Sequence, residues 1–164
     1  WEAARLAAGA GLLEAAAWSR SAQALAHEAI ATVYVTGGPA LPAPMLALRS
    51  SAGAPAQFVF DRGQLGGPPG LLSFVVSASS EEREALQLQV LAQAREQLGL
   101  AGLQPLLTVI EKRATFACTP GLERPPARVA PGLVACGDYV EGPYPATIEG
   151  AVRSGRAAGG LGPV

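Results

Sequence analysis

The sequence predicts an α+β fold, and three observations lead to that prediction. A β-branched and aromatic run over residues 30–35 stops at two glycines and a proline, which is typical of a strand end. Ser79 or Ser80 precedes several glutamates, and apolar residues then recur every fourth position until Gly99, which predicts a capped helix. A small-residue stretch over 146–158 predicts a second helix. Helices and strands are therefore both expected.

The remaining elements of the first two thirds follow from local composition. Residues 1–26 are dominated by helix-forming residues and predict one or two short helices. Strands are expected at 57–60, 71–76 and 106–116, with a glycine-rich and proline-rich loop over 61–70.

The last third changes in composition. Prolines spread over 120–131 predict an irregular stretch, because proline cannot donate to a ladder or a helix interior. Residues 132–138 are expected to form a short buried apolar strand that ends in Gly-Asp, and Pro145 introduces the predicted helix over 146–158.

Composition excludes one class of function. The chain has 164 residues, of which only 15% are charged, against roughly 25% in typical soluble domains. Its 12 basic and 13 acidic residues form no strong blocks, so it lacks the electrostatic footprint of a nucleic-acid binder. We expect an unusually apolar surface.

Neither a membrane span nor a metal site is expected. The uncharged stretches 29–48 and 63–80 are interrupted by glycine and proline. Cys118 and Cys136 are too few and too far apart for a redox pair or a zinc site, which favours two free thiols. The chain starts with neither methionine nor a signal sequence, so we expect it to begin within a longer protein or after processing.

The residues around Asp138 carry the strongest indication of a ligand. The predicted strand delivers Asp138 at its carboxyl end, where open α/β sheets bind ligands, and a helix N-terminus follows. Gly150 and Gly155 would let this helix pack closely on a sheet or a cofactor. Spacing alone leaves a tightly packed terminal helix and a cofactor site equally open.

Residues 137–155 resemble the C-terminal flavin-contacting signature of the amine oxidase and carotenoid desaturase group of FAD enzymes. Within that group, residues 59–67 and 111–121 look like the squalene-associated branch, the hydroxysqualene dehydroxylases. The resemblance implies FAD-dependent reductive removal of a hydroxyl from hydroxysqualene, giving squalene for hopanoid synthesis. Hydride would pass from reduced flavin to an allylic, carbocation-like centre as the hydroxyl departs.

The resemblance also implies a set of cofactor-binding residues. Asp138 would hydrogen-bond the ribityl or pyrophosphate region, and the helix-start amides would stabilise negative charge at the flavin C2 carbonyl. Two further residues would lie beside the isoalloxazine, and the apolar sheet would form the floor of an isoprenoid channel. The implied cofactor-binding residues are Gly137 and Asp138, then Tyr144 and Pro145, which would lie beside the ring, and the amides of Ala146, Thr147 and Ile148.

One family feature is missing, and it defines the expected domain organisation. The GxGxxG turn that holds the FAD pyrophosphate is absent, since Glu14 occupies the last glycine position of the nearest match. The resemblance therefore predicts a C-terminal fragment, with residues 1–116 as the later part of the substrate-binding domain, a mixed sheet with helices. Residues 117–164 would be the returning strand and helix of a Rossmann-like FAD-binding domain. We expect the chain without its N-terminal half to be inactive and to self-associate.

The catalytic acid stays open among Glu141, Asp61 and an ordered water. A capping or surface role is favoured for His27, the sole histidine. Asp61 and Arg62 form either a local ion pair at a turn or a loop-orienting pair. Residues 111–113 are expected on a solvated strand face, and Ser154 lies inside a predicted helix, which does not support serine hydrolysis.

Two other functions remain open at this point. One is an FAD-dependent desaturase or amine oxidase that uses the same contacts in the oxidative direction. The other is a non-catalytic module on the same scaffold that binds an apolar ligand or a protein, which the low charge content suits. The family resemblance implies an isoprenoid substrate and a cytoplasmic protein, and it leaves peripheral membrane contact open.

Overall fold

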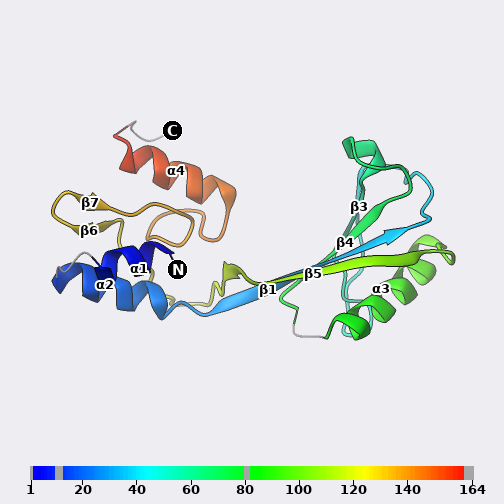
Figure 1. The fold of residues 1–164 in the computed structure, drawn as a ribbon, viewed down its shortest axis with the longest axis horizontal. Coiled ribbons are helices and arrows are strands. Elements are labelled where there is room, and N and C mark those ends of the chain that lie inside the picture. The colour runs from blue at the N-terminus through cyan, green and yellow to red at the C-terminus, as the bar shows by residue number, and fades with distance from the viewer. Residues whose placement is uncertain (1, 10–12, 80–81, 161–164) are drawn as a thin grey trace. The chain divides into compact units, whose positions relative to one another are not determined.

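A computed structural model describes residues 2–9, 13–79 and 82–160 (Figure 1). The chain divides into two compact units, residues 28–114 and residues 1–27 with 115–164. The predicted assignment of 1–116 and 117–164 to a substrate-binding and an FAD-binding domain stays a prediction. In the structure, residues 1–27 group with the C-terminal residues.

The unit 28–114 is built on a five-stranded sheet with strand order β2-β3-β4-β1-β5. The pairs β2–β3, β3–β4 and β1–β4 are antiparallel. The helix α3 packs on one face of this sheet (Figure 1). In chain order the elements are β1 (His27–Thr36), β2 (Met45–Ala47), β3 (Phe58–Asp61), the short 3-10 helix η1 (Gly63–Leu65), β4 (Leu72–Ser77), α3 (Arg83–Leu98) and β5 (Gln104–Phe116).

The main core lies between α3 and the sheet. Alternate residues of the central strands β1 and β4 point toward the helix and are buried, because successive side chains of a strand face opposite sides. On the helix, four-residue spacing places the contacting residues on one face, as expected from the sequence. These core residues are Ala31, Val33, Val35, Leu72, Phe74, Val76, Leu86, Val90 and Ala94.

The opposite side of the sheet, which we call the open face, is also rich in apolar residues. Register places Met45, Phe60, Ser73 and Tyr34 in one row across four strands, and a second row runs through Phe58. Met45 and Phe58 are exposed, as are Leu107 and Val109 of β5. The open face therefore carries exposed apolar side chains on β2, β3 and β5, with Tyr34 and Ser73 on the central strands between them.

The strands predicted in this unit are confirmed, but the start of α3 differs from its prediction. Ser79 does not cap the helix, because its buried hydroxyl has no hydrogen-bond partner among the described residues. Its amide donates to Ala29 O at 3.0 Å and so extends the β1–β4 pairing. Glu82 is the N-cap residue and makes no side-chain cap bond. Ser80, the other predicted cap, lies outside the described residues. Gly99 ends the helix in the left-handed region, as predicted.

The second unit is mostly loops and short elements. Its helices are α1 (Glu2–Gly9), α2 (Leu13–Gln23) and α4 (Ile148–Ala158), and its strands β6 (Arg128–Ala130) and β7 (Leu133–Val134) form an antiparallel hairpin. The small core joins Trp18, Ala15 and Val129. The Trp18 Nε1 donates to Pro126 O at 2.7 Å, and its ring meets Tyr139 edge to face.

Two predictions for this unit are wrong. The strand expected over 132–138 is limited to β7, which is exposed, because pairing with β6 ends at Ala135 and Gly137 has a φ of 148°. The stretch 120–131 is not wholly irregular, since β6 lies within it. The helix α4 starts two residues later than expected because Ala146 has a φ of 56°.

None of the described helices is long and apolar enough to cross a membrane.

Candidate functional site

A pocket of about 640 Å³ lies in the second unit, between the loop that follows β7 and the helix α4. This volume falls within the range of small-molecule sites, roughly 300–1,000 Å³. Its walls are formed mainly by glycine, alanine and other apolar residues, with a few polar groups among them. The lining residues are Ala127, Val134, Gly137, Asp138, Val140, Glu141, Gly142, Pro143, Gly150, Arg153, Ser154, Ala157, Ala158 and Gly160.

Asp138 is half-buried in the wall of this pocket. Within the described parts of the chain, nothing donates a hydrogen bond to its carboxylate, whereas its carbonyl accepts from Ala146 N at 3.4 Å. The preceding amide, Gly137 N, donates to Ser154 Oγ of α4 at 3.0 Å. Ser154 therefore ties the Gly137–Asp138 turn to the helix and leaves the carboxylate available to a ligand.

A second segment supports the same loop from the side. The Arg124 guanidinium donates to Asp138 O at 3.2 Å, to Val140 O at 2.7 Å and to Gly142 O. In return, Glu141 N donates to Pro125 O at 2.8 Å. The backbone over 138–142 is thus fixed by side-chain and main-chain bonds from 124–125.

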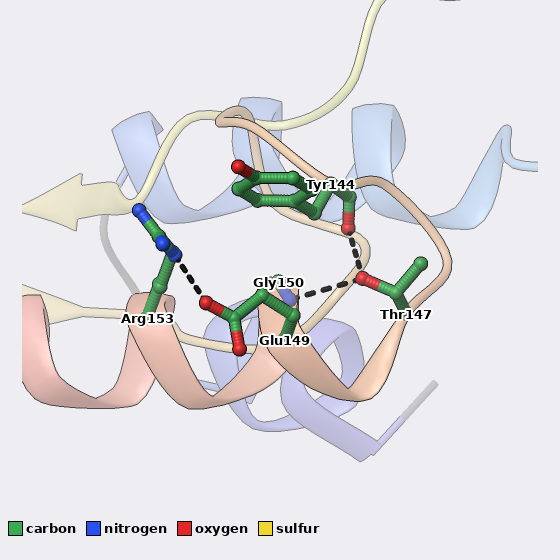
Figure 2. Close-up of polar contacts among 5 residues, drawn as sticks. All are labelled: Tyr144, Thr147, Glu149, Gly150 and Arg153. Carbon is green, nitrogen blue, oxygen red and sulfur yellow. Dashed lines mark hydrogen bonds and ion pairs between the residues drawn. The ribbon is translucent and has the colours of Figure 1, made fainter. Parts of the chain in front are cut away.

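Figure 2 shows how Thr147 caps the start of α4. Thr147 is the N-cap residue: its hydroxyl accepts from Gly150 N at 3.0 Å and donates to Tyr144 O at 2.7 Å. No described group accepts from the N–H of Thr147, Ile148 or Glu149, as expected for the first turn of a helix. Three amides at the positive end of a helix dipole are therefore open to an anion or a carbonyl oxygen.

The turn before α4 has an unusual backbone. Tyr144 and Ala146 both have a φ of 56°, the left-handed region that L-residues rarely adopt. A Cβ at Gly150 would lie 2.2 Å from Tyr144 O, so only glycine fits where the helix meets this turn. Gly155, the other glycine singled out in α4, meets nothing within 4 Å.

A charged pair accompanies this turn, as Figure 2 shows. The Arg153 guanidinium lies 4.9 Å from the centre of the Tyr144 ring, and its Nε donates to Glu149 Oε1 at 2.6 Å. The bond to Glu149 raises the pKa of Arg153 above its usual range, so the guanidinium stays charged. Arg153 also lines the pocket.

The structure brings together only part of the predicted site. Gly137 and Asp138 line the pocket, whereas Tyr144, Pro145, Ala146, Thr147 and Ile148 belong to the turn and helix start outside its lining. Among the predicted amides, that of Ala146 is engaged by Asp138 O, while those of Thr147 and Ile148 are open.

Sequence reasoning missed the roles of two residues in this region. Arg124 bonds to the loop carbonyls, and Ser154 accepts the hydrogen bond of Gly137 N. Arg124 lies in the proline-rich stretch that was expected to be irregular, and no local pattern marks it. Its role depends on contacts with carbonyl groups more than ten positions away along the chain.

The donor set of the site suits a flavin nucleotide. A free carboxylate can accept hydrogen bonds from sugar or ribityl hydroxyls, and helix-start amides can bind a carbonyl oxygen or an anion. Gly137, Gly142 and Gly150 line the pocket: a Cβ would lie 2.5 Å from the Tyr139 ring at Gly137 and 2.2 Å from Tyr144 O at Gly150, and it would meet nothing within 4 Å at Gly142. The residues present therefore fit the cofactor that the resemblance implies.

Asp61 is not suited to act as the catalytic acid. It is 3% exposed, and its carboxylate accepts hydrogen bonds from Leu41 N, Gly63 N, Gln64 N and Gln64 Nε2. The bond from the Gln64 side chain and that from Leu41 N lower its pKa, so it stays ionised. No described ion pair joins Asp61 to Arg62, so the interpretation as a local ion pair is wrong, and Asp61 instead holds two loops together.

The other polar candidates have simple environments. His27 is exposed at the start of β1, and Glu141 is exposed at the edge of the pocket. Residues 111–113 of β5 are all exposed, so the strand is solvated on both faces here and not on one face as expected. Cys118 and Cys136 are free thiols, as predicted. Burial, together with Cys136 and Asp138, raises the pKa of Tyr139, so its hydroxyl remains protonated.

Comparison with known proteins supports the family resemblance. No protein-family model matches the chain. A hydroxysqualene dehydroxylase from Rhodopseudomonas palustris is 37% identical over 101 residues, which is 57% of this chain and 24% of that protein. A hydroxysqualene dehydroxylase from Sinorhizobium fredii is 43% identical over 67 residues, 38% of this chain and 16% of that protein.

The matches thus span less than a quarter of the length of either relative. Both relatives carry the name of the family that residues 59–67, 111–121 and 137–155 resemble. Over the matched part, this chain is similar to the hydroxysqualene dehydroxylases.

Proposed function

We propose that this chain forms part of an FAD-dependent oxidoreductase that acts on an isoprenoid, with hydroxysqualene as substrate and squalene as product. The names of the two relatives support the reaction. The free Asp138 carboxylate in the wall of a pocket of small-molecule size is the structural observation that carries the proposal.

In this proposal Asp138 binds a hydroxyl of the ribityl or sugar part of FAD. A hydrogen bond to a charged group contributes about 1.5–3 kcal/mol when it is well formed. Because no described residue already donates to this carboxylate, the bond to a ligand would not displace a bond within the protein.

The helix α4 acts on the electron-rich part of the cofactor. The open amides of Thr147 and Ile148 lie at the positive end of the helix and would stabilise negative charge on the reduced ring. When bound, reduced flavin would supply the hydride that replaces the departing hydroxyl. The left-handed backbone at Tyr144 and Ala146 supports a functional role for this turn, because such conformations collect at ligand sites.

The open face of the sheet supports an apolar substrate. Exposed Met45, Phe58, Leu107 and Val109 would bury area against an isoprenoid chain, at roughly 25 cal/mol per Å². The proton that assists hydroxyl departure would come from either Glu141 or an ordered water, since the Asp61 carboxylate is already engaged. A substrate of this kind dissolves in lipid, so we extend the proposal to a cytoplasmic enzyme with peripheral membrane contact.

The test uses the intact protein that contains this chain. We expect it to carry FAD and, once reduced with dithionite under anaerobic conditions, to convert hydroxysqualene to squalene, measured by gas chromatography and mass spectrometry. Bound FAD with no squalene, but with oxidation of an amine or desaturation of an isoprenoid, would instead establish the oxidative alternative. A protein that binds no flavin would favour the non-catalytic binding module.

A further inference from the structure

We propose that Arg124 is a positioning residue that holds Asp138 in its ligand-binding orientation. This inference rests on the proposed function, because it concerns how the FAD site is held. Arg124 is not among the residues that line the pocket, and its guanidinium bonds to the backbone carbonyls of the lining loop that carries Asp138.

The contacts of Arg124 are concentrated on one short loop. Its Nη1 donates to both Asp138 O and Val140 O, and its Nη2 donates to Gly142 O. Arg124 is half-buried, and hydrogen bonds from an ionised donor are roughly twice as strong as neutral ones. One guanidinium therefore gathers three carbonyls of a five-residue loop.

The adjoining residue strengthens this arrangement. Pro125 is fully buried, and its carbonyl accepts from Glu141 N, while Val140 is only 3% exposed. The loop is thus bonded to the segment 124–125 in both directions. Because Asp138 and Gly142 lie at the two ends of the braced stretch, these bonds fix the backbone from which the Asp138 side chain extends.

The choice of acceptors matters for ligand binding. Arg124 bonds to the Asp138 carbonyl, and no described ion pair joins it to the Asp138 carboxylate. An arginine paired with that carboxylate would compete with a ligand hydroxyl, whereas this one fixes the backbone and leaves the carboxylate open. Lysine cannot reproduce the effect, since one ammonium does not span three carbonyls with the geometry of a fork.

The test compares Arg124→Met and Arg124→Lys in the intact protein, with Arg20→Met as the matched control because Arg20 is exposed on α2 of the same unit. We expect FAD affinity, from fluorescence titration of the apoprotein, to fall about ten-fold in Arg124→Met and less in Arg124→Lys. Amide hydrogen exchange should accelerate over 138–142 without a general loss of protection. Arg20→Met should change neither measurement. The lysine variant retains the charge and provides the result if the methionine variant does not fold.

A double-mutant cycle with Asp138→Asn shows whether Arg124 acts through Asp138. If it does, the combined loss of affinity is smaller than the product of the single losses. Losses that multiply fully, unchanged exchange over 138–142, or wild-type FAD affinity in both Arg124 variants would overturn the inference. A wild-type protein that binds no FAD overturns the proposed function, and the exchange measurement then still decides whether Arg124 fixes this loop.

Discussion

Each of the two units is stabilised internally by a different kind of contact. Residues 28–114 have an extended core in which strands β1, β3 and β4 and the helix α3 contribute fully buried side chains. Among the described residues of the other unit, the core cluster consists of Ala15, Trp18 and Val129. Its loops are held by hydrogen bonds that the Arg124 and Trp18 side chains donate and that the Ser154 hydroxyl accepts. Apolar packing dominates in the first unit, and directed polar contacts dominate in the second.

The units also differ in how they use polar groups. In residues 28–114, the buried Asp61 and Gln93 find several partners each. In the second unit, the Asp138 carboxylate and the first amides of α4 have none among the described residues. Polar groups that are buried need partners within the protein, whereas groups left open beside a pocket are ready for a ligand. The comparison therefore places the larger packed core in the first unit and the candidate cofactor site in the second.

The largest expected effect is the loss of core packing in the unit 28–114. Phe74 is fully buried, and Phe74→Ala should lower the free energy of unfolding by about 3–5 kcal/mol because it removes a ring and leaves a cavity. Urea unfolding followed by far-UV circular dichroism measures the change. Phe58→Ala on the open face is the control, and an equal loss there would show that the open face is packed.

The corresponding change in the second unit is Asp138→Ala. In the intact protein we expect FAD affinity to fall about ten-fold or more, since a hydrogen bond to a charged group is removed. The measurement is the FAD content per protein after gel filtration. His27→Ala should retain both FAD and activity because His27 is exposed at the start of β1. Loss of turnover in His27→Ala with unchanged flavin content would make His27 the leading proton donor.

The contribution of buried hydrogen bonds to the stability of the first unit can be tested at Gln93. Its side chain accepts from Ala56 N and donates to Ala56 O and Arg49 O, and it is 1% exposed. Gln93→Leu should cost about 1–3 kcal/mol in urea unfolding because buried backbone groups lose their partners. Gln97 makes similar bonds in an exposed setting, where water can replace them. Gln97→Leu should therefore cost less than about 1 kcal/mol, and equal costs would contradict the role of burial.

The sequence predicted the first unit better than the second, for a physical reason. Periodicity and punctuation identify elements that pack locally, so the strand at 30–35 and the helix that ends at Gly99 were predicted with the right type and place. β2 was missed because Met45–Ala47 is a short edge strand beside prolines, and its pairing with β3 decides its state.

In the second unit, the candidate site depends on contacts that local sequence patterns do not reveal. The predicted strand over 132–138 has the apolar composition of a strand, but Gly137 breaks its extended backbone and β7 pairs only within the hairpin with β6. The position of Asp138 follows from Arg124 and Ser154, which lie far from it in sequence. The strand-end argument and the family resemblance both pointed to Asp138, but neither predicted the contacts that hold its loop.

A smaller effect is expected at the turn before α4. Ala146 has a φ of 56°, and relief of a left-handed alanine by glycine should raise the free energy of unfolding by about 1 kcal/mol in Ala146→Gly. Ala151 lies inside α4, where the same substitution should lower it by about 1 kcal/mol. The two changes thus have opposite signs, and urea unfolding of both variants decides whether the turn adopts this backbone. A loss of stability in Ala146→Gly would contradict it.

The smallest expected effect is the acid dependence contributed by Asp61. Its hydrogen bonds lower the pKa below the ordinary carboxyl value of about 4. A group whose folded pKa is depressed stabilises the fold at pH values above its unfolded pKa, and this stabilisation is lost as pH falls through the folded pKa. The melting temperature should therefore be steady near neutral pH and decline below about pH 4. Asp61→Asn should melt several degrees lower at neutral pH and show a shallower decline, because the asparagine amide cannot accept the same set of bonds. Glu96→Gln, at an exposed position of α3, should keep the full decline. An acid profile of Asp61→Asn that parallels the wild type would mean that the carboxylate does not hold these loops through its charge.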